Sequence, residues 1–590
     1  MKAVLKRLQT EPCRSREITE NDRESFSNYT HLQRYFPALD LFPIPDSALS
    51  HKNMELPTPF YIKEWKSQDK PKFWSAIRTD GVALEEPCQV FTKIVHLLNP
   101  VDMIKEKYVC PEHPLLPQSE KTWKNTLLKL HSHNNQAYVD AVANTVLSRF
   151  REMNMTPHCI LSYGSMTGIA KTYQFNISDE YETYRQCRWF WKGMQSHSAR
   201  LTLVHDEEAK DLPHIKEFYD QITTCPFDGD EEDIILAPLD GIEDTSDTES
   251  IRSFTFDNIE EEAENATSIF EINKKVTKRV SEKRAESPAS EEDSKSEASD
   301  GSDGSYESDE SNLEQLNIDI CLEIPNMPII MIAQEAQEGV MDSLLDEDTI
   351  DGHERETQGW EARWIAWMFQ VVAALTFLQS AICFTHNDLH SNNILWRATD
   401  KKYLYYRKRD GTTWRVPTYG KIFSIIDFGR SIFRLGKHLW VSDDHWPDQD
   451  AGDQYNFGPF FDHSKPKVVP NPSFDLCRLA VSLIDGLFDE PPPKKKGKGV
   501  PVMSEEGDWV VHETRSPLYN LLWSWTVDDA GRTVYEDKDG EEKYEGFELY
   551  IRIAQDVHRA VPKDQLHRPV FEQFVWKNKV TEDTVYLLGV

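Results

Sequence analysis

The sequence lacks the cysteine patterns that build disulfide frameworks and zinc modules. It has nine cysteines in 590 residues, and no two of them form a C-x-x-C pair. Scattered cysteines in odd number predict reduced thiols in an intracellular protein. The first 22 residues also lack the apolar stretch that a signal peptide needs, so we expect no secretory signal.

Basic side chains are scarce as well. The chain has 66 Lys and Arg against 100 Asp and Glu, which gives a formal net charge of -34. Binding to the nucleic-acid backbone needs clustered cations, so this charge argues against direct nucleic-acid binding. What the chain does have is 39% hydrophobic and 11% aromatic residues. This is enough for a sizeable core in a soluble protein of several domains' length.

One apolar run is long enough to cross a membrane. Residues 364–385 carry no charged side chain over 22 positions. Gln370, Gln379 and Ser380 dilute the run, and a polar motif follows it without a basic flank. We therefore predict a buried helix of a globular domain and no membrane span.

Residues 226–318 differ from the rest of the chain in composition. Clusters such as DGDEED (228–233) lead into SPASEEDSKSEASDGSDGSYESDES (287–311), with almost nothing apolar. Such a segment cannot offset the entropy cost of folding and is predicted to be disordered. Its Ser-acid pattern indicates a phosphorylation substrate, and its charge favours basic protein partners such as histones. A basic cluster, KKVTKR (274–279), indicates either nuclear targeting or local charge balance in a linker.

The sequence on both sides of this segment is typical of folded elements. Residues 89–95 predict a strand and residues 136–150 a helix. Residues 159–165 predict a strand followed by a turn. Residues 327–335 predict a continuously apolar, buried strand. Residues 401–416 predict an extended hairpin.

Two polar motifs in the second half carry the residue types of a phosphoryl-transfer site. FTHNDLHSNNILW (384–396) places Asp388 five residues before Asn393, and SIIDFGRS (424–431) contains Asp427. Phosphoryl transfer needs a carboxylate that orients the attacking hydroxyl, and an amide and a second carboxylate that hold Mg²⁺. The order and spacing match the catalytic loop and the metal-binding motif of protein kinases.

The histidines of the first motif allow two other interpretations. A zinc site would use His386, His390 and Asp388. No third nitrogen or sulfur ligand is near them in the sequence, and Asn393 leads into a strand-like segment, so we reject zinc. A structural polar turn would explain His386, but not the two aspartates and the asparagine together.

The chain resembles the protein kinase superfamily, and more narrowly the divergent serine/threonine kinase-like proteins of giant nucleocytoplasmic large DNA viruses. The resemblance covers roughly residues 85–225 and 320–580. It rests on these stretches: NNQAYVDAVANTVLS (134–148), TPHCILSYGS (156–165), THNDLHSNNILW (385–396), DQYNFGPFF (453–461), SFDLCRLAVSLID (473–485) and DGEEKYEGFELY (539–550). It implies an α+β, bilobal, protein-kinase-like fold, with a small antiparallel sheet lobe, a helical lobe and the acidic insertion.

The resemblance implies roles for the residues of the two motifs. Asp388 is expected to be the catalytic base, and Asn393 and Asp427 the ligands of Mg²⁺. His386 and Asp475 are expected to support the catalytic loop structurally.

The resemblance also implies an ATP site in the first half. Lys93 stands where the family's lysine grips the nucleotide phosphates, and Asp140 is the best-placed acid to pair with it. Gln334 and Glu335 fall in the hinge that would meet the adenine.

Five segments follow from these assignments. Residues 1–75 form an N-terminal extension of unknown role, and residues 76–225 the first part of the small lobe. Residues 226–318 are the disordered acidic insertion. Residues 319–345 contain the hinge strand and the start of the next helix, and residues 346–590 form the helical lobe.

Several positions depart from the family's pattern. No G-x-G-x-x-G precedes Lys93, and Gly81 is the glycine available for a loop over the phosphates. Asn387 stands where an arginine is usual, so activation by loop phosphorylation is not expected in its usual form. His390 replaces a lysine, and no A-P-E motif follows Asp427.

The function expected from the sequence is Mg²⁺-dependent transfer of the γ-phosphate of ATP to Ser or Thr hydroxyls of protein substrates. Two alternatives stay open. One is a small-molecule phosphotransferase of the aminoglycoside or choline kinase kind. The other is a pseudokinase scaffold whose acidic tract binds basic partners. The expected location is intracellular, in the host cytoplasm or viral factory, with the virion and the nucleus as alternatives.

Overall fold

The computed structural model describes residues 18–35, 60–109, 121–204, 219–225, 318–496, 500–502, 509–580 and 584–589, apart from short gaps within these ranges. The chain divides into two compact units, Met1–Tyr173 with Ile324–Val590, and Gln174–Glu323. It contains helices and several antiparallel sheets, so the fold is α+β as predicted. The predicted acidic insertion lies outside the described residues, except for its last position.

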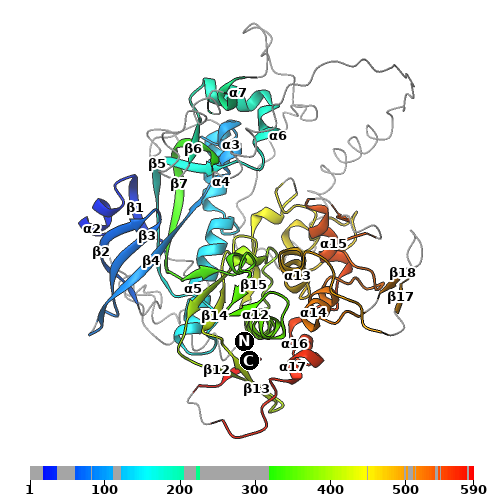
Figure 1. The fold of residues 1–590 in the computed structure, drawn as a ribbon. Coiled ribbons are helices and arrows are strands. Elements are labelled where there is room, and N and C mark those ends of the chain that lie inside the picture. Colours follow the sequence, from blue (N-terminus) through cyan, green and yellow to red (C-terminus); the bar gives the residue numbers. More distant parts are fainter. Residues whose placement is uncertain are drawn as a thin grey trace, which may run out of the picture. The chain divides into compact units, whose positions relative to one another are not determined.

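One large sheet organises the first half of the chain (Figure 1). Its strand order is β1-β5-β7-β4-β3-β2, and β6 pairs with β7 beside this path. The strands are β1 (Tyr29–Tyr35), β2 (Tyr61–Lys70), β3 (Phe73–Thr79), β4 (Glu85–His96), β5 (Ser162–Asn176), β6 (Arg200–Val204) and β7 (Asp319–Glu335). β4 is central and pairs antiparallel with β3 and β7, which places Lys93 opposite Ile332.

A short helix, α2 (Glu20–Ser25), covers one face of β2 and β3. Trp65 and Trp74 are buried there, and both rings have their centroids 4.9 Å from that of Phe26. Trp65 Nε1 donates to Asp22 Oδ1 at 3.0 Å. The predicted boundary at residue 75 is therefore wrong, because it falls inside β3 and separates strands of one sheet.

The helices described between β4 and β5 end with α5, the longest of them. They are α3 (Pro100–Ile104), α4 (Lys121–His131) and α5 (Gln136–Glu152). Ala137 and Ala141, one turn apart on α5, form a buried cluster with Leu97, Ile330 and Ile332 next to β4 and on β7. Small side chains at these positions let α5 approach the sheet closely. This brings Asp140, the neighbour of Ala141 on the helix, next to Lys93 on β4.

The second unit is described at α6 (Tyr181–Arg185), α7 (Arg188–Gln195), β6 and the first residues of β7. β6 pairs antiparallel with β7, from Arg200 opposite Glu323 to Val204 opposite Asp319. Tyr181 packs edge-on against a phenylalanine of α7, so aromatic packing holds the two short helices together.

The long helix α12 (Gln358–Ile382) is the core of the second half of the chain. Trp364, Trp367 and Phe369 on this helix are completely buried. The most apolar stretch of 18 residues in this helix is 89% buried, which confirms the predicted buried helix. The polar Gln370 is satisfied, because Nε2 donates to Lys421 O at 3.1 Å and Oε1 accepts from Phe423 N at 3.1 Å.

Short strands and helices surround α12. The strands are β8 (Gly339–Val340), β9 (Thr349–Ile350), β10 (His353–Glu354), β11 (Ile394–Ala398), β12 (Tyr403–Lys408), β13 (Thr413–Pro417), β14 (Lys421–Ile425), β15 (Ile432–Leu435), β16 (His438–Val441), β17 (Val500–Val502), β18 (Trp509–Val511) and β19 (Tyr586–Leu588). The helices are α13 (Phe474–Leu487), α14 (Pro517–Trp525), α15 (Glu548–Asp556), α16 (Pro562–Gln565) and α17 (Pro569–Glu572). In sequence and in space, the first motif lies between α12 and β11, and the second follows β14.

Most predicted elements are confirmed. Residues 89–95 lie in β4, residues 136–150 in α5 and residues 327–335 in β7. The extended hairpin is formed by β12 and β13. The turn predicted within residues 159–165 is wrong: β5 continues through it, because Gly164 has φ +110° and accommodates this angle without ending the strand.

Candidate active site

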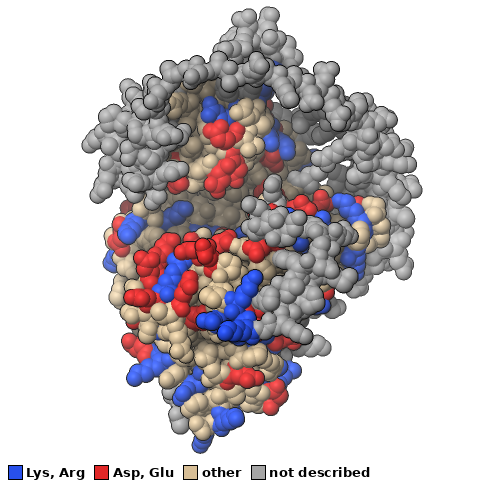
Figure 2. All heavy atoms as spheres, turned by 45° about the vertical axis from the view of Figure 1, so that its right-hand side comes forward, with Lys and Arg blue, Asp and Glu red and all other residues tan. Residues whose placement is uncertain are grey.

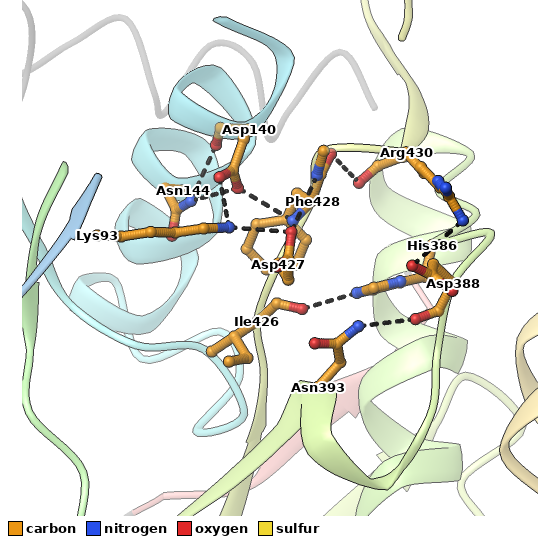
Figure 3. A network of polar contacts seen from close by, with 12 residues as sticks. Lys93, Asp140, Asn144, His386, Asp388, Asn393, Ile426, Asp427, Phe428 and Arg430 are labelled. Atoms are coloured by element: carbon orange, nitrogen blue, oxygen red, sulfur yellow. Dashed lines mark hydrogen bonds and ion pairs between the residues drawn. The ribbon is translucent and has the colours of Figure 1, made fainter. Parts of the chain in front are cut away.

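Lys93 lies between two carboxylates (Figure 3). Its Nζ is 2.6 Å from Asp140 Oδ2 and 2.9 Å from Asp427 Oδ1. The lysine comes from β4, Asp140 from α5, and Asp427 from the segment after β14. The Asp140 side chain is 1% exposed, whereas that of Asp427 is 47% exposed. One cation is therefore shared between a buried acid and an accessible one.

The pKa values of the three groups follow from this arrangement. Burial raises the pKa of Asp140, and the charge of Lys93 offsets this only in part. For Asp427, whose side chain is half exposed, partial desolvation acts in the same direction, but Lys93 outweighs it and lowers the pKa to about 2. Burial acts to lower the pKa of Lys93, yet the two carboxylates raise it. Lys93 and Asp427 are thus charged at neutral pH.

A second set of bonds ties α5 to the Asp427 motif. Asp140 Oδ1 accepts from Asn144 Nδ2 at 2.9 Å and from Phe428 N at 3.0 Å. Asp427 itself has φ +63°, in the left-handed region that aspartate tolerates better than most residues. Backbone strain of this kind persists where the surroundings hold it, often at functional sites. The position of the motif therefore depends on the helix.

The buried carboxylate of Asp475 holds the backbone of the first motif in place. Asp475 on α13 accepts from His386 N with both oxygens at 3.0 Å, and from Asn387 N at 3.0 Å. His386 Nε2 donates to Ile426 O at 2.7 Å, and Ile426 N donates to Asn393 O at 3.0 Å. These bonds hold the two motifs side by side, and Asp475 and His386 both have the architectural contacts expected of them.

Asp388 is engaged on both oxygens. Oδ1 accepts from Tyr550 Oη at 2.7 Å, and Oδ2 is 3.6 Å from Arg430 Nη1. Arg430 directly follows the second motif's Asp-Phe-Gly, and Tyr550 lies on α15. Sequence reasoning assigned no role to either. A cation three residues after Asp427 was the available signal for the arginine, and Tyr550 ends DGEEKYEGFELY (539–550), one of the stretches that carry the resemblance.

Asn393 and Asp427 fit a Mg²⁺ site. Asn393 Nδ2 donates to Asp388 O at 2.9 Å and lies 3.0 Å from His390 Nε2. Its amide oxygen accepts no hydrogen bond from the described residues. Amide and carboxylate oxygens are ligands that Mg²⁺ prefers, with water and phosphate oxygens completing its shell. The described residues hold no group of three or more His, Cys, Asp or Glu that could bind a metal.

The two predicted hinge residues have their side chains turned to α5. Gln334 is buried, and its Nε2 donates to Asn144 Oδ1. Glu335 forms an ion pair with Arg151, with Nη2 2.9 Å from Oε1. A nucleotide base could therefore meet only the backbone of this segment. Glu335 N already donates to Leu161 O at 2.8 Å.

An aromatic pair lies on the Lys93 face of the sheet. Phe91 precedes Lys93 by two residues on β4, so both point to the same face. Phe73 lies directly opposite Phe91, and their ring centroids are 5.0 Å apart. Phe73 is 36% exposed. These rings offer an apolar surface for a planar group next to the lysine.

The loop nearest to Lys93 contains no glycine. β2 and β3 are joined by the turn at Pro71 and Lys72, and Lys72 O accepts from Thr92 N at 2.8 Å, beside Lys93. Gly81, the glycine considered for a phosphate-covering loop, lies instead in the turn between β3 and β4. This turn is at the opposite end of β3, so Gly81 does not belong to the loop near Lys93.

Two adjacent acids after β16 contact the site from another side. Asp443 Oδ2 is 2.6 Å from Lys129 Nζ, and Oδ1 accepts from Gln136 N at 3.0 Å, at the start of α5. Asp444 Oδ2 is 3.7 Å from Arg430 Nε. One acid thus holds the helix that carries Asp140, and the other holds the arginine next to Asp388. Sequence reasoning did not single out these acids.

Replacing Asp444 with asparagine should make the protein more stable above neutral pH. Burial raises the pKa of Asp444 to about 7, and Arg430 offsets this only in part. Because this pKa lies above that of the unfolded chain, the folded state binds more protons between pH 4 and 7. The wild type therefore loses stability as pH rises through this window. The gain of Asp444→Asn in free energy of unfolding should grow by about 2 kcal/mol between pH 5 and 8.

Urea unfolding of both proteins at several pH values measures this gain. A gain that is the same at pH 5 and at pH 8 would contradict the assignment of the titration to Asp444.

The structure brings together the predicted site residues Lys93, Asp140 and Asp427, and it joins them through Ile426 to the loop of Asp388 and Asn393. Gln334 and Glu335 lie at the end of β7, opposite Phe91 and Val90 on the strand that carries the lysine. No protein-family model matches this sequence, and no curated protein matches it.

Proposed function

We propose that this protein transfers the γ-phosphate of ATP to hydroxyl groups of protein substrates, with Mg²⁺, on a bilobal protein-kinase-like fold. The observation that carries the proposal is the ion-pair set of Lys93, Asp140 and Asp427. Backbone bonds through Ile426 connect it to the loop that contains Asp388 and Asn393. A lysine paired with a helix acid and two metal-binding groups are the parts that such a reaction needs.

The order of the strands supports the same fold. β2, β3, β4 and β7 follow one another in the sheet, and β5 continues it on the far side of β7. This is the order expected of the five strands of a kinase small lobe, with α5 packed on the strands that carry the lysine and the hinge. β1 adds a sixth strand at the β5 edge.

Each residue has a defined task in the proposed reaction. Lys93 binds the nucleotide phosphates, and Asp140 holds the lysine in place. Asp388 orients the acceptor hydroxyl and takes its proton as the bond to phosphorus forms. Asn393 and Asp427 would hold Mg²⁺, which neutralises charge on the phosphates when bound. Phe73 and Phe91 offer the base a stacking surface.

Side chains of opposite charge gather in separate areas of the surface. On the face shown in Figure 2, acidic side chains gather over one area and a smaller basic cluster lies beside it. Complementary charge on a protein partner could orient it over such a surface. A small molecule would contact only the site itself.

The decisive experiment incubates the purified protein with labelled ATP, Mg²⁺ and a panel of proteins that includes the chain itself. We expect labelled protein, and we expect Asp388→Asn and Asp427→Asn each to lower the rate by about 10³-fold or more, because removing such groups costs several kcal/mol of transition-state stabilisation. Asp453→Asn, an exposed aspartate paired with Lys465, is the matched control and should keep the rate.

Other results would redirect the proposal. Transfer to an aminoglycoside or to choline, with no labelled protein, would favour a small-molecule phosphotransferase. Absence of any thermal shift with ATP and Mg²⁺ would contradict the proposed catalysis and favour a pseudokinase scaffold.

A further inference from the structure

The hydroxyl of Tyr550 stands where an acceptor hydroxyl would stand. It donates to Asp388 Oδ1 with an oxygen–oxygen distance of 2.7 Å. This distance is short enough for a general base to take the proton of the hydroxyl. Tyr550 belongs to α15, and Asp388 to the loop after α12, 162 residues earlier. The acceptor side of the base is therefore occupied by a residue of the same chain.

The tyrosine is held in this position by its surroundings. Arg478 Nε on α13 donates to Tyr550 Oη at 2.9 Å. The ring stacks on Phe547 with a centroid distance of 5.1 Å, and Phe474 lies 5.8 Å away on another side. A side chain fixed by two hydrogen bonds and two ring contacts is pre-organised for a reaction, rather than one of many rotamers on a surface.

The phenol keeps its proton and directs it at a carboxylate. Burial raises the pKa of Tyr550, and the charge of Asp388 acts in the same direction. The phenol therefore carries its proton at neutral pH and needs a base to lose it. Asp388 is the group to which that proton is already directed.

Two guanidinium groups contact the Tyr550–Asp388 pair, one on each residue. Arg478 already touches the phenol oxygen, and Arg430 is 3.6 Å from the other oxygen of Asp388. Arginine binds phosphate through parallel N–H donors. A phosphate on Tyr550 would thus meet cations as well as the repulsion of Asp388.

We propose that Tyr550 is a phosphorylation site that the protein modifies within its own chain. The inference rests on the proposed kinase function. In the reaction, the phenol oxygen forms a bond to the γ-phosphorus, the bond from that phosphorus to the β,γ-bridging oxygen breaks, and ADP leaves. The phenol proton passes to Asp388. The products are phosphotyrosine and ADP.

The test uses the full chain after phosphatase treatment. The protein is incubated with ATP and Mg²⁺, and its tryptic peptides are analysed by mass spectrometry over time. We expect phosphate on Tyr550, at an initial rate per molecule that does not change over a 100-fold range of protein concentration. Asp388→Asn should show none. Tyr544→Phe, which removes a nearby tyrosine that does not contact Asp388, should leave the modification unchanged.

The outcomes separate this inference from the function on which it rests. Transfer to an added protein, or to other residues of the chain, with Tyr550 unmodified would overturn the self-modification and leave the kinase. No transfer and no nucleotide binding would overturn both. A rate on Tyr550 that rises with protein concentration would show reaction between molecules and would overturn modification within one chain.

Discussion

Lys93→Met should strongly reduce phosphoryl transfer and also destabilise the protein. The lysine supplies the positive charge between Asp140 and Asp427, and Asp140 is 1% exposed. Removing one partner of a buried ion pair leaves an uncompensated charge, at a typical cost of about 3 kcal/mol or more. Loss of the cation that binds the phosphates should lower the rate by about 10²–10³-fold.

The loss of stability should depend on pH in a defined direction. Without Lys93, burial raises the pKa of Asp140 without an offsetting charge, so the carboxyl group would be neutral at low pH and costly to ionise as pH rises. Thermal unfolding of Lys93→Met should therefore differ most from wild type at high pH. Equal destabilisation at all pH values would contradict this account.

Two variants make the result specific to the ion pair. Lys66 pairs with Glu64 at 2.6 Å on the surface, and both are about half exposed. Lys66→Met should change stability by less than about 1 kcal/mol, because exposed ion pairs contribute little. In Lys93→Met/Asp140→Leu the buried charge is gone, so stability should return in part while the rate of transfer stays as low as in Lys93→Met. If the double variant were as unstable as Lys93→Met, the loss of stability would not come from the unpaired charge of Asp140.

Asp443→Ala should lower activity although Asp443 contacts neither motif directly. Its carboxylate pairs with Lys129 and accepts from Gln136 N at the start of α5, and its own N–H donates to Asn134 O at 2.7 Å. An acid at a helix N-terminus stabilises the helix by about 0.5–2 kcal/mol. Without it, the first turn of α5 loses its anchor, and Asp140 lies one turn further on. We expect about a tenfold to hundredfold loss of kcat.

This acid also explains how the site could work without loop phosphorylation. Kinases commonly use a phosphate after the metal-binding motif to position the helix that carries the acid partner of the lysine. In this protein the carboxylate of Asp443 accepts a hydrogen bond from that helix and carries its charge without phosphorylation. Phosphatase treatment should therefore leave the positioning of α5, and the affinity for ATP, unchanged.

Kinetics of Asp443→Ala and Asp443→Glu measure the effect. The glutamate variant keeps the charge and should recover part of the loss, whereas a purely structural defect would appear in both as lower thermal stability. Asp453→Asn is the matched control, because Asp453 is exposed, pairs with Lys465 at 2.6 Å, and has φ +68°, which asparagine tolerates. An Asp443→Ala variant with wild-type kcat would exclude the anchoring role.

The sequence predicted the parts of the site that are local in the chain. Asp388, Asn393 and Asp427 lie in short motifs, and Lys93 and Asp140 lie in a strand and a helix whose periodicity is clear. Residues of this kind can be placed because their spacing carries the information.

The parts that the sequence did not predict are contacts between distant segments. Asp443 and Gln136 are 307 positions apart, and Tyr550 and Asp388 are 162 apart. A single carboxylate after a short strand, or a single phenol on a helix, gives no pattern that reveals its partner. The same holds for Gln334, whose engagement with Asn144 depends on how closely α5 packs on β7.

The pairing of β4 with β7 has a consequence for how much the chain can change. Lys93 and Ile332 are neighbours in the sheet, yet 239 positions (332 − 93) separate them in sequence. The entropy lost in closing such a loop grows only with the logarithm of its length, by about 0.6 kcal/mol for each doubling. The sheet is thus almost indifferent to how many residues connect β6 to β7. We therefore expect a change in the length of this connection to cost the pairing of β4 with β7 little free energy.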